Sequence, residues 1–252
     1  MAFHDAVTGR PNGSIRYELE WSENRALSRP FAVVQTIRDA ARADAAVNSH
    51  VGSFADTLAL VAAQSIEHVG GPRIVVKLGR PVSATADPYF LEKPLGKETE
   101  RSIVTKTMPD AGLDSDGLRL YFRRLGLAED EFVALSGIHG MGRHVSLLGM
   151  EKGCLKNLTR TCLEEAPVLL PFVASSTDHF SNAYFEALLR WNTQKVGMGE
   201  VAFIPTDVAL VVDPDLRRYV QAFASDEQLY IKTFIRAWQT LVESTATTHE
   251  RY

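Results

Sequence analysis

The sequence lacks the features that mark several large classes of protein. Its 27 lysines and arginines are outnumbered by 31 acidic residues, and the formal net charge is −4. No run of basic residues is present, and a nucleic-acid-binding surface would need a concentrated positive face. No apolar stretch approaches the roughly 20 residues that a membrane-spanning helix requires. The sequence therefore predicts no nucleic-acid partner and no transmembrane segment. It also contains no recognisable targeting peptide.

Cysteine is also scarce, with Cys154 and Cys162 as the two in the chain. The seven residues between them allow a local disulfide in an oxidising compartment. Two unrelated reduced thiols are an equally good interpretation, because two cysteines define no disulfide framework. No second Cys or His pair stands at ligand spacing, so a zinc site is not expected.

The sequence shows helical periodicity over much of its length. It predicts helices over 30–44, 53–68, 115–125, 129–139, 181–191, 213–223 and 225–243. Ser53 with Asp56 forms a capping-box-like start, and Ser225 with Asp226 is expected to cap the last helix.

Strand signals are few. Short strands are predicted over 73–78 and 200–204. The segment 80–110 is rich in turn residues and is expected to wrap the surface, while 143–178 is interpreted as a packed loop. Composition does not shift along the chain. We therefore predict one all-α unit over 1–252, with two helical lobes around a cleft.

Two motifs carry a family resemblance. EFVALSGIHGMGR, at 131–143, resembles the proximal motif of class I haem peroxidases of the ascorbate peroxidase family. The resemblance implies that His139 is the axial ligand of a haem b iron. IPTDVALVVDP, at 204–214, resembles the segment whose Asp accepts a hydrogen bond from that His, which implies this role for Asp207. Outside this context, an Asp after Thr and before an apolar run is usually a helix cap.

The N-terminal AFHDA, at 2–6, resembles the distal motif of the same family. The resemblance implies that His4 is the acid–base residue that moves a proton between the peroxide oxygens, and that Phe3 is the distal aromatic residue. Asn24 matches the Asn that orients the distal His. A lone His near a terminus is otherwise a solvated bystander.

Further matches follow in the family's order: SFADTLALVAAQSIEHVGGP at 53–72, Gly79-Arg80, and the tail at 213–241. Together the motifs cover nearly the whole chain. Each is weak alone, but their order and spacing indicate kinship. The resemblance implies the all-α haem peroxidase fold, with two lobes around the haem cleft and few strands.

Several family positions differ here. The distal Arg is expected four residues before His4, whereas the chain starts three residues before it, so we expect an N-terminus truncated relative to the family. The proximal Trp position falls at Val173. The cation-site Thr residues correspond to Gly140 and Ala174, and an acidic residue is lost after Arg80. The ascorbate-contacting loop is replaced by 144–171, for which Arg143 and Lys152 are candidate contacts, with surface solvation as the alternative.

These differences lead to two hypotheses. The first is a non-catalytic relative with a degenerate haem site, an accessory subunit of a larger assembly such as a photosystem, in the thylakoid lumen of a plastid. The apolar stretch VLLPFV, at 168–173, would be its contact or fold onto its own core. The alternative is an active haem peroxidase that reduces hydrogen peroxide with ascorbate or another small reductant.

Overall fold

Helices dominate the part of the chain that the structure describes. The computed structural model describes residues 1–8, 11–48, 51–87, 108–110, 112–145, 169–173, 178–191 and 203–243. The α-helices are α1 (Ala2–Ala6), α2 (Ser28–Ala43), α3 (Phe54–His68), α5 (Ser115–Arg124), α6 (Glu129–Ser136), α9 (Ala183–Leu189), α10 (Pro205–Val212), α11 (Pro214–Ser225) and α12 (Glu227–Glu243). Short 3-10 turns are η1 (Ser14–Tyr17), η2 (Ser22–Leu27) and η4 (Gly137–Met141). The fold is the all-α one that the sequence predicts.

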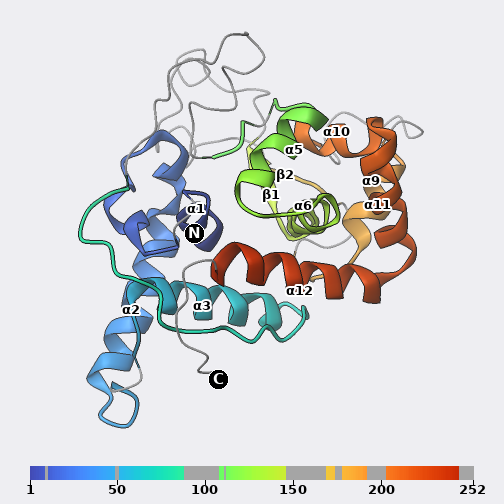
Figure 1. Ribbon diagram of the computed structural model, residues 1–252. Coiled ribbons are helices and arrows are strands. Elements are labelled where there is room, and N and C mark those ends of the chain that lie inside the picture. Colours follow the sequence, from blue (N-terminus) through green and yellow to red (C-terminus); the bar gives the residue numbers. More distant parts are fainter. Residues whose placement is uncertain are drawn as a thin grey trace.

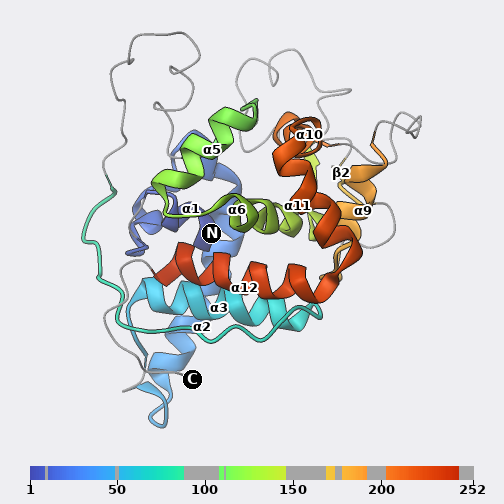
Figure 2. The same ribbon diagram turned by 45° about the vertical axis from the view of Figure 1, so that its right-hand side comes forward.

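The elements form two groups joined by the last helix (Figures 1 and 2). The first group contains α1, α2 and α3, and the second contains α5, α6 and α9 to α11. Helix α12 packs against α6 and also contacts α1, so one long helix supports both groups. In both views it runs alongside α3, beneath α6.

Helix ends agree with the capping signals, with one correction. The Ser53 side chain accepts a hydrogen bond from the Asp56 amide, and the Asp56 carboxylate accepts one from the Ser53 amide, which completes the predicted capping box. Asp226 accepts from the Leu229 amide at the start of α12. Ser225 is not a cap of that helix, because it is the last residue of α11 and its hydroxyl donates back to carbonyls of α11.

The strand predictions are wrong where they can be checked. Residues 73–78 are extended and include a single bridge residue, Lys77, but form no strand. The Lys77 amide donates to the Glu243 side chain, and the Val75 carbonyl accepts from the Gln239 side chain, both on α12. In the predicted strand 200–204, the structure describes Phe203 and Ile204, which form no strand and directly precede α10. The observed strands are β1 (Arg143–Val145) and β2 (Leu169–Pro171), an antiparallel pair within the segment interpreted as a loop.

An aromatic core lies under the second group. It contains Phe180, Tyr184, Phe185, Phe223, Tyr230, Phe234 and Trp238, whose rings contact one another edge-on or stacked. Three α-helices, α9, α11 and α12, contribute to it together with Phe180 from the segment before α9. Side chains of this size each bury a large apolar area, so this core fixes how α9, α11 and α12 pack.

Several predictions lie outside the described residues. These are the pairing of Cys154 and Cys162, the role of Lys152, the substitution at Ala174, and most of the segments 80–110 and 144–171. In the part that the structure describes, no helix combines the length and hydropathy of a membrane span.

Candidate functional site

His139 lies in a tight turn that continues α6. The α-helix ends at Ser136, and Gly137–Met141 follow as the 3-10 turn η4, so His139 stands just past the helix end. Gly137 is required there, because a Cβ at this position would lie 2.6 Å from the Tyr230 hydroxyl. The turn therefore packs closely on the ring of Tyr230, which belongs to the aromatic core.

His139 and Asp207 are joined by a hydrogen bond, as the sequence predicts. The distance from His139 Nδ1 to Asp207 Oδ1 is 2.8 Å, across 68 residues of sequence. A carboxylate only accepts, so Nδ1 carries a proton, and in its neutral form the ring presents the Nε2 lone pair. The Asp207 side chain is 1% exposed, whereas the His139 ring is 32% exposed. The imidazole is thus anchored at its buried edge and reachable at the other.

Asp207 serves as a helix cap as well. Its Oδ2 accepts from the Ile204 amide at 3.0 Å, closing the first turn of α10, which begins at Pro205. Oδ1 faces His139. The two interpretations of this residue, cap and partner of His139, therefore both hold, one for each oxygen.

Phe172 lies on the His139 ring. The two ring centroids are 4.5 Å apart and the planes are 20° from parallel. The sequence places the family's proximal Trp at the next residue, Val173. Val173 is buried beside it at 4% exposure. Phe172 directly follows β2. Because β2 pairs with β1, the strand that follows η4, Phe172 is brought next to the imidazole on η4.

Tyr184 is a site residue that the sequence did not reveal. Its hydroxyl donates to Asp207 Oδ1 at 2.6 Å, and its ring meets the edge of the His139 ring. Burial, followed by the Asp207 charge, raises the pKa of Tyr184 well above its ordinary value, so the hydroxyl stays protonated. In the sequence, SNAYF at 181–185 indicates only part of the predicted helix 181–191. No local sequence signal singles out Tyr184, because its contact with Asp207 depends on the packing of α9 on η4.

His4 and Asn24 form a second imidazole pair. The distance from His4 Nδ1 to Asn24 Oδ1 is 2.7 Å. The Asn24 amide nitrogen donates to the Glu18 carbonyl, which fixes the amide with its oxygen toward His4. His4 therefore donates from Nδ1, and Asn24, at 2% exposure, holds the ring in one orientation. Phe3 lies next to His4 in an edge-on ring contact at 6.3 Å.

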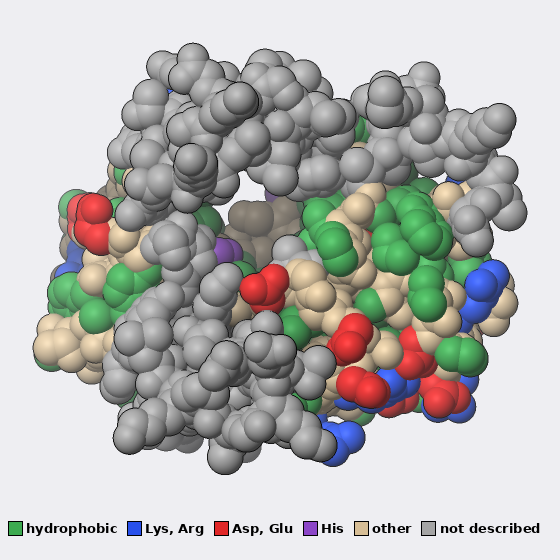
Figure 3. Space-filling model, turned by 90° about the horizontal axis from the view of Figure 1, so that it is seen from above, with side chains coloured by type: hydrophobic (Ala, Val, Ile, Leu, Met, Phe, Trp, Pro, Cys, Tyr) green, Lys and Arg blue, Asp and Glu red, His purple; other side chains and the backbone are tan. Residues whose placement is uncertain are grey.

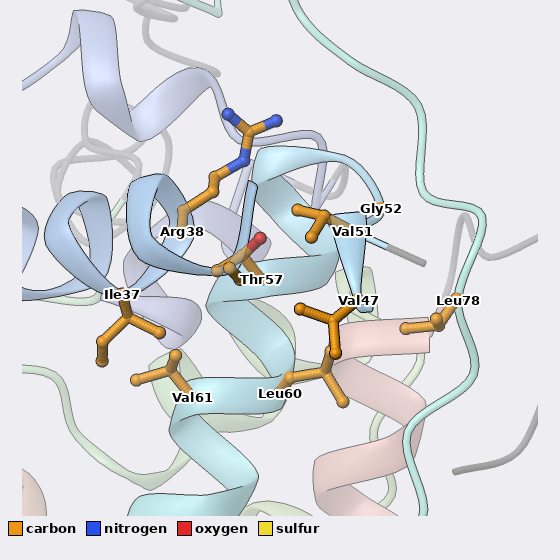
Figure 4. A pocket seen from close by; sticks show the side chains of 10 residues that line it. Ile37, Arg38, Val47, Val51, Gly52, Thr57, Leu60, Val61 and Leu78 are labelled. Carbon is orange, nitrogen blue, oxygen red and sulfur yellow. The ribbon is translucent and has the colours of Figure 1, made fainter. Parts of the chain in front are cut away.

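The two imidazole pairs belong to the two groups of helices. His4 is on α1 and His139 is on η4, and α12 contacts α1 as well as α6, which leads into η4. Figure 3, which looks onto this side of the molecule, shows a hollow with histidine side chains on its walls. A separate pocket between α2 and α3 contains none of the predicted site residues (Figure 4).

These residues fit a haem iron ligand better than a metal ion held by protein alone. Within the described ranges, no three His, Cys, Asp or Glu side chains are arranged to hold a metal ion. One imidazole whose other nitrogen donates to a carboxylate is a suitable haem iron ligand, and His139 with Asp207 supplies this arrangement. Gly140 cannot be exchanged for Thr without a shift, because a Cβ there would lie 3.2 Å from Tyr184 Cβ.

Comparison with known proteins gives a consistent result. The model of the family described as "Peroxidase" matches residues 1–226. The chain is 31% identical over 204 residues to the "Putative heme-binding peroxidase" of Cryptococcus neoformans var. neoformans serotype D (strain JEC21), a match covering 76% of this chain and 53% of that protein. It is 31% identical to the "Putative L-ascorbate peroxidase 6" of Arabidopsis thaliana, covering 98% of this chain and 62% of that protein. It is also 31% identical to the "Probable L-ascorbate peroxidase 8, chloroplastic" of Oryza sativa subsp. japonica, covering 91% and 43%. The chain thus spans about half the length of these relatives.

Proposed function

Because this chain belongs to the peroxidase family, as an ascorbate peroxidase-like member of class I, we propose that it binds haem b through His139 and reduces hydrogen peroxide with ascorbate or another small reductant. The observation that carries this proposal is the pair of oriented imidazoles. His139 is held by Asp207 and His4 by Asn24, each through Nδ1. A haem peroxidase uses one histidine as the iron ligand and another as the acid–base residue, and the two rings on the two groups of helices match these roles.

Each residue has a defined task in this proposal. Haem, when bound, supplies the iron at which peroxide is reduced. Asp207 keeps the Nδ1 proton on His139 and raises the basicity of the opposite nitrogen. His4 takes a proton from one peroxide oxygen and returns it to the other through Nε2, and Asn24 keeps the ring turned for that transfer. Phe3 and Phe172 cover the rings with apolar surface.

Haem titration of the full chain tests the ligand. We expect a Soret band that saturates at one haem per chain, and loss of this saturable binding in His139→Ala. His68→Ala is the matched control, because His68 is an exposed residue at the end of α3. Equal binding by both variants would remove His139 from the site.

A second candidate function is a non-catalytic subunit. Two observations favour it: the ring on His139 is Phe172 rather than an indole, and Gly140 replaces a Thr expected in the family's cation site. In this version the chain works within a larger, photosynthetic assembly in the thylakoid lumen. Some relatives have names that give a chloroplastic or peroxisomal location, which supports an organelle.

Turnover separates the two candidates. Haem-loaded full-length protein is assayed with hydrogen peroxide and ascorbate, and native extracts are sized by gel filtration. The active enzyme predicts turnover that falls on His4→Ala, by on the order of 100-fold for a lost acid–base residue. The subunit predicts no turnover and a complex far larger than the 27.8 kDa chain.

A further inference from the structure

Asp207 shares one oxygen between two side-chain donors. Its Oδ1 accepts from His139 Nδ1 at 2.8 Å and from the Tyr184 hydroxyl at 2.6 Å, while Oδ2 is occupied by the Ile204 amide. All three donors compete for the charge of one carboxylate. The hydrogen bond from His139 is therefore weaker than it would be to an Asp207 without Tyr184.

The Tyr184 hydroxyl has no room to leave this position. The side chain is 0% exposed, and its ring packs on Phe185 and the edge of His139. Asn182, just before α9, donates to the carbonyls of Phe223 and Ala224 and ties α9 to α11. On the other side, Gly140 brings the η4 backbone so close that any Cβ there would press on Tyr184.

We infer that Tyr184 is a positioning residue that sets how strongly Asp207 acts on His139, and through His139 on a bound haem. This rests on the proposed haem binding. Phe172, the ring that lies flat on His139, has no N–H, so it adds no donor to Asp207. The donor comes from Tyr184 instead, and it holds His139 closer to a neutral imidazole than an unshared carboxylate would.

The test replaces Tyr184 with Phe and uses Tyr230→Phe as the matched control. Tyr230 is also 0% exposed in the same aromatic core, but its hydroxyl has no hydrogen-bond partner among the described residues. Both variants lose one buried hydroxyl, and only Tyr184→Phe loses a bond to Asp207. Any effect of packing alone should appear in both.

Three readouts make the outcomes distinguishable. In the haem-free protein, the ¹H resonance of His139 Nδ1–H should move downfield in Tyr184→Phe, because the bond to Asp207 strengthens. In the haem-loaded protein, the iron reduction potential should fall and the iron–histidine stretching frequency should rise. Tyr230→Phe should leave all three unchanged. Unchanged values in Tyr184→Phe would overturn the inference, and failure to bind haem with a shifted Nδ1–H signal would overturn only the proposed function.

Arg38 carries a second, independent inference. It lies on the buried stripe of α2, a helix whose other side chains are mostly exposed, and it is itself 9% exposed. In the described part of the chain it makes no hydrogen bond or ion pair, and its Nε is buried without a partner. Arginine is rarely buried unless it is paired. The comparable buried Arg80 is paired with Asp56 at 3.0 Å.

The surroundings of Arg38 add positive charge. Its guanidinium lies over the Phe54 ring, and that of Arg16 lies over the same ring, at 6.0 Å and 5.7 Å from the centroid. Burial first, then Arg42 and Arg16, lower the pKa of Arg38, and Asp39 opposes this. An unpaired buried charge is costly, and a bound anion would relieve the cost.

Arg38 also stands at one end of an apolar pocket of about 280 Å³ between α2 and α3. Its remaining lining is apolar apart from Thr57 and includes Ile37, Leu60 and Val61. In Figure 4 the guanidinium points away from Leu60 and Val61, so the charge and the apolar surface are at opposite ends. Ile37 and Leu60 remain 44% and 36% exposed, which is unusual for large apolar side chains gathered at one place.

We propose that this pocket binds an amphiphilic carboxylate, with its apolar body between Ile37 and Leu60 and its carboxylate on Arg38. The probe is octanoate, measured by calorimetry on the full chain, with octan-1-ol as the uncharged ligand of the same length. Octanoate should bind at least tenfold more tightly than octanol, because a hydrogen bond between charged groups is worth about that factor or more.

Variants place the binding at Arg38. Arg38→Gln should weaken octanoate binding at least tenfold, while Arg42→Gln, which removes the same charge from an exposed position one turn later, should change it less than about threefold. Ile37→Glu puts a carboxylate on the exposed rim of the pocket and should also weaken octanoate binding. This variant tests the same site if Arg38→Gln does not fold. Equal affinity for octanoate and octanol, or wild-type binding by a folded Arg38→Gln or Ile37→Glu, would overturn the proposal.

Discussion

Asp5 is a buried residue that supports the backbone around His4 and Asn24. It follows His4 directly, is 1% exposed, and accepts hydrogen bonds from the amides of Gly13 and Ile15. These bonds tie α1 to the turn η1, and Asn24, which orients His4, is attached to the carbonyl of Glu18, just after η1. Burial, with Glu18 and Asp87 nearby, raises the pKa of Asp5 to about 6.

Asp5 therefore makes stability depend on pH in a defined direction. The folded protein holds the Asp5 proton more tightly than the unfolded chain, whose Asp pKa is about 3.9. The contribution of this group is most favourable below pH 4 and falls as the pH rises to about 6 and beyond, by about 3 kcal/mol. Asp5→Asn cannot titrate.

The measurement is urea unfolding of wild type and Asp5→Asn at pH 4 and pH 7.5. Relative to wild type, the variant should gain free energy of unfolding between the two pH values. It should be the less stable protein at pH 4, because a carboxamide has one oxygen where the carboxyl group has two, and an amide of Gly13 or Ile15 then faces the NH2 group. A difference that stays constant with pH would show that Asp5 is ionised in the same range in both states.

At the scale of elements, one arginine holds three helices together. Arg119 on α5 donates to both oxygens of Asp213 at 2.8 Å and to Glu129, the first residue of α6. Asp213 also caps α11 by accepting from the amides of Asp215 and Leu216. The pair is 17% and 16% exposed, which limits screening by solvent. This clamp aligns α5, α6 and α11, and α6 leads into the turn that carries His139.

Asp213→Asn should destabilise the protein by about 2 kcal/mol, the scale of a hydrogen bond to a charged partner. Arg119 holds the pKa of Asp213 well below its ordinary range, so this stability is present above about pH 4 and is lost as the pH falls further. Thermal or urea unfolding at pH 7 and pH 3 measures it. The control is Glu186→Gln, which removes a half-exposed pair with Arg190 at 3.9 Å and should cost less than about 0.5 kcal/mol.

At the scale of the whole molecule, a ligand between two groups of helices should couple binding to folding. Haem at 100 times its dissociation constant should stabilise the folded chain by about 2.7 kcal/mol, or roughly 5–10 °C in Tm. Calorimetry with and without haem measures this shift. His139→Ala should lose the shift while keeping its haem-free Tm within a few degrees. A shift that persists in the variant would indicate haem bound elsewhere.

The two cysteines report on the compartment in which the whole molecule works. If the protein resides in an oxidising lumen, Cys154 and Cys162 should be bridged, because their spacing allows a local disulfide. Thiol labelling of protein isolated without reductant, before and after reduction, measures the pairing. Two freely reactive thiols would count against both the bridge and the lumenal location.

The sequence by itself determined most of the helices and two polar contacts of the site, His139 with Asp207 and His4 with Asn24. Caps such as Ser53 with Asp56 act within four residues, so local chemistry decides where α3 begins. The contact between His139 and Asp207 was predictable because both lie in motifs that resemble a known family, although 68 residues separate them. Near the site, the start of α10 was equally readable, since Pro205 and Asp207 favour a first helical turn.

Only the tertiary structure decided what surrounds His139. Phe172 reaches the ring through the pairing of β1 with β2, and a shift of one residue in that register would turn Val173 toward it instead. Tyr184 meets Asp207 because α9 packs on η4, and no local pattern in SNAYF encodes that neighbour. Side-chain periodicity specifies which face of an element is buried, whereas the partner that buries it depends on how the rest of the chain packs.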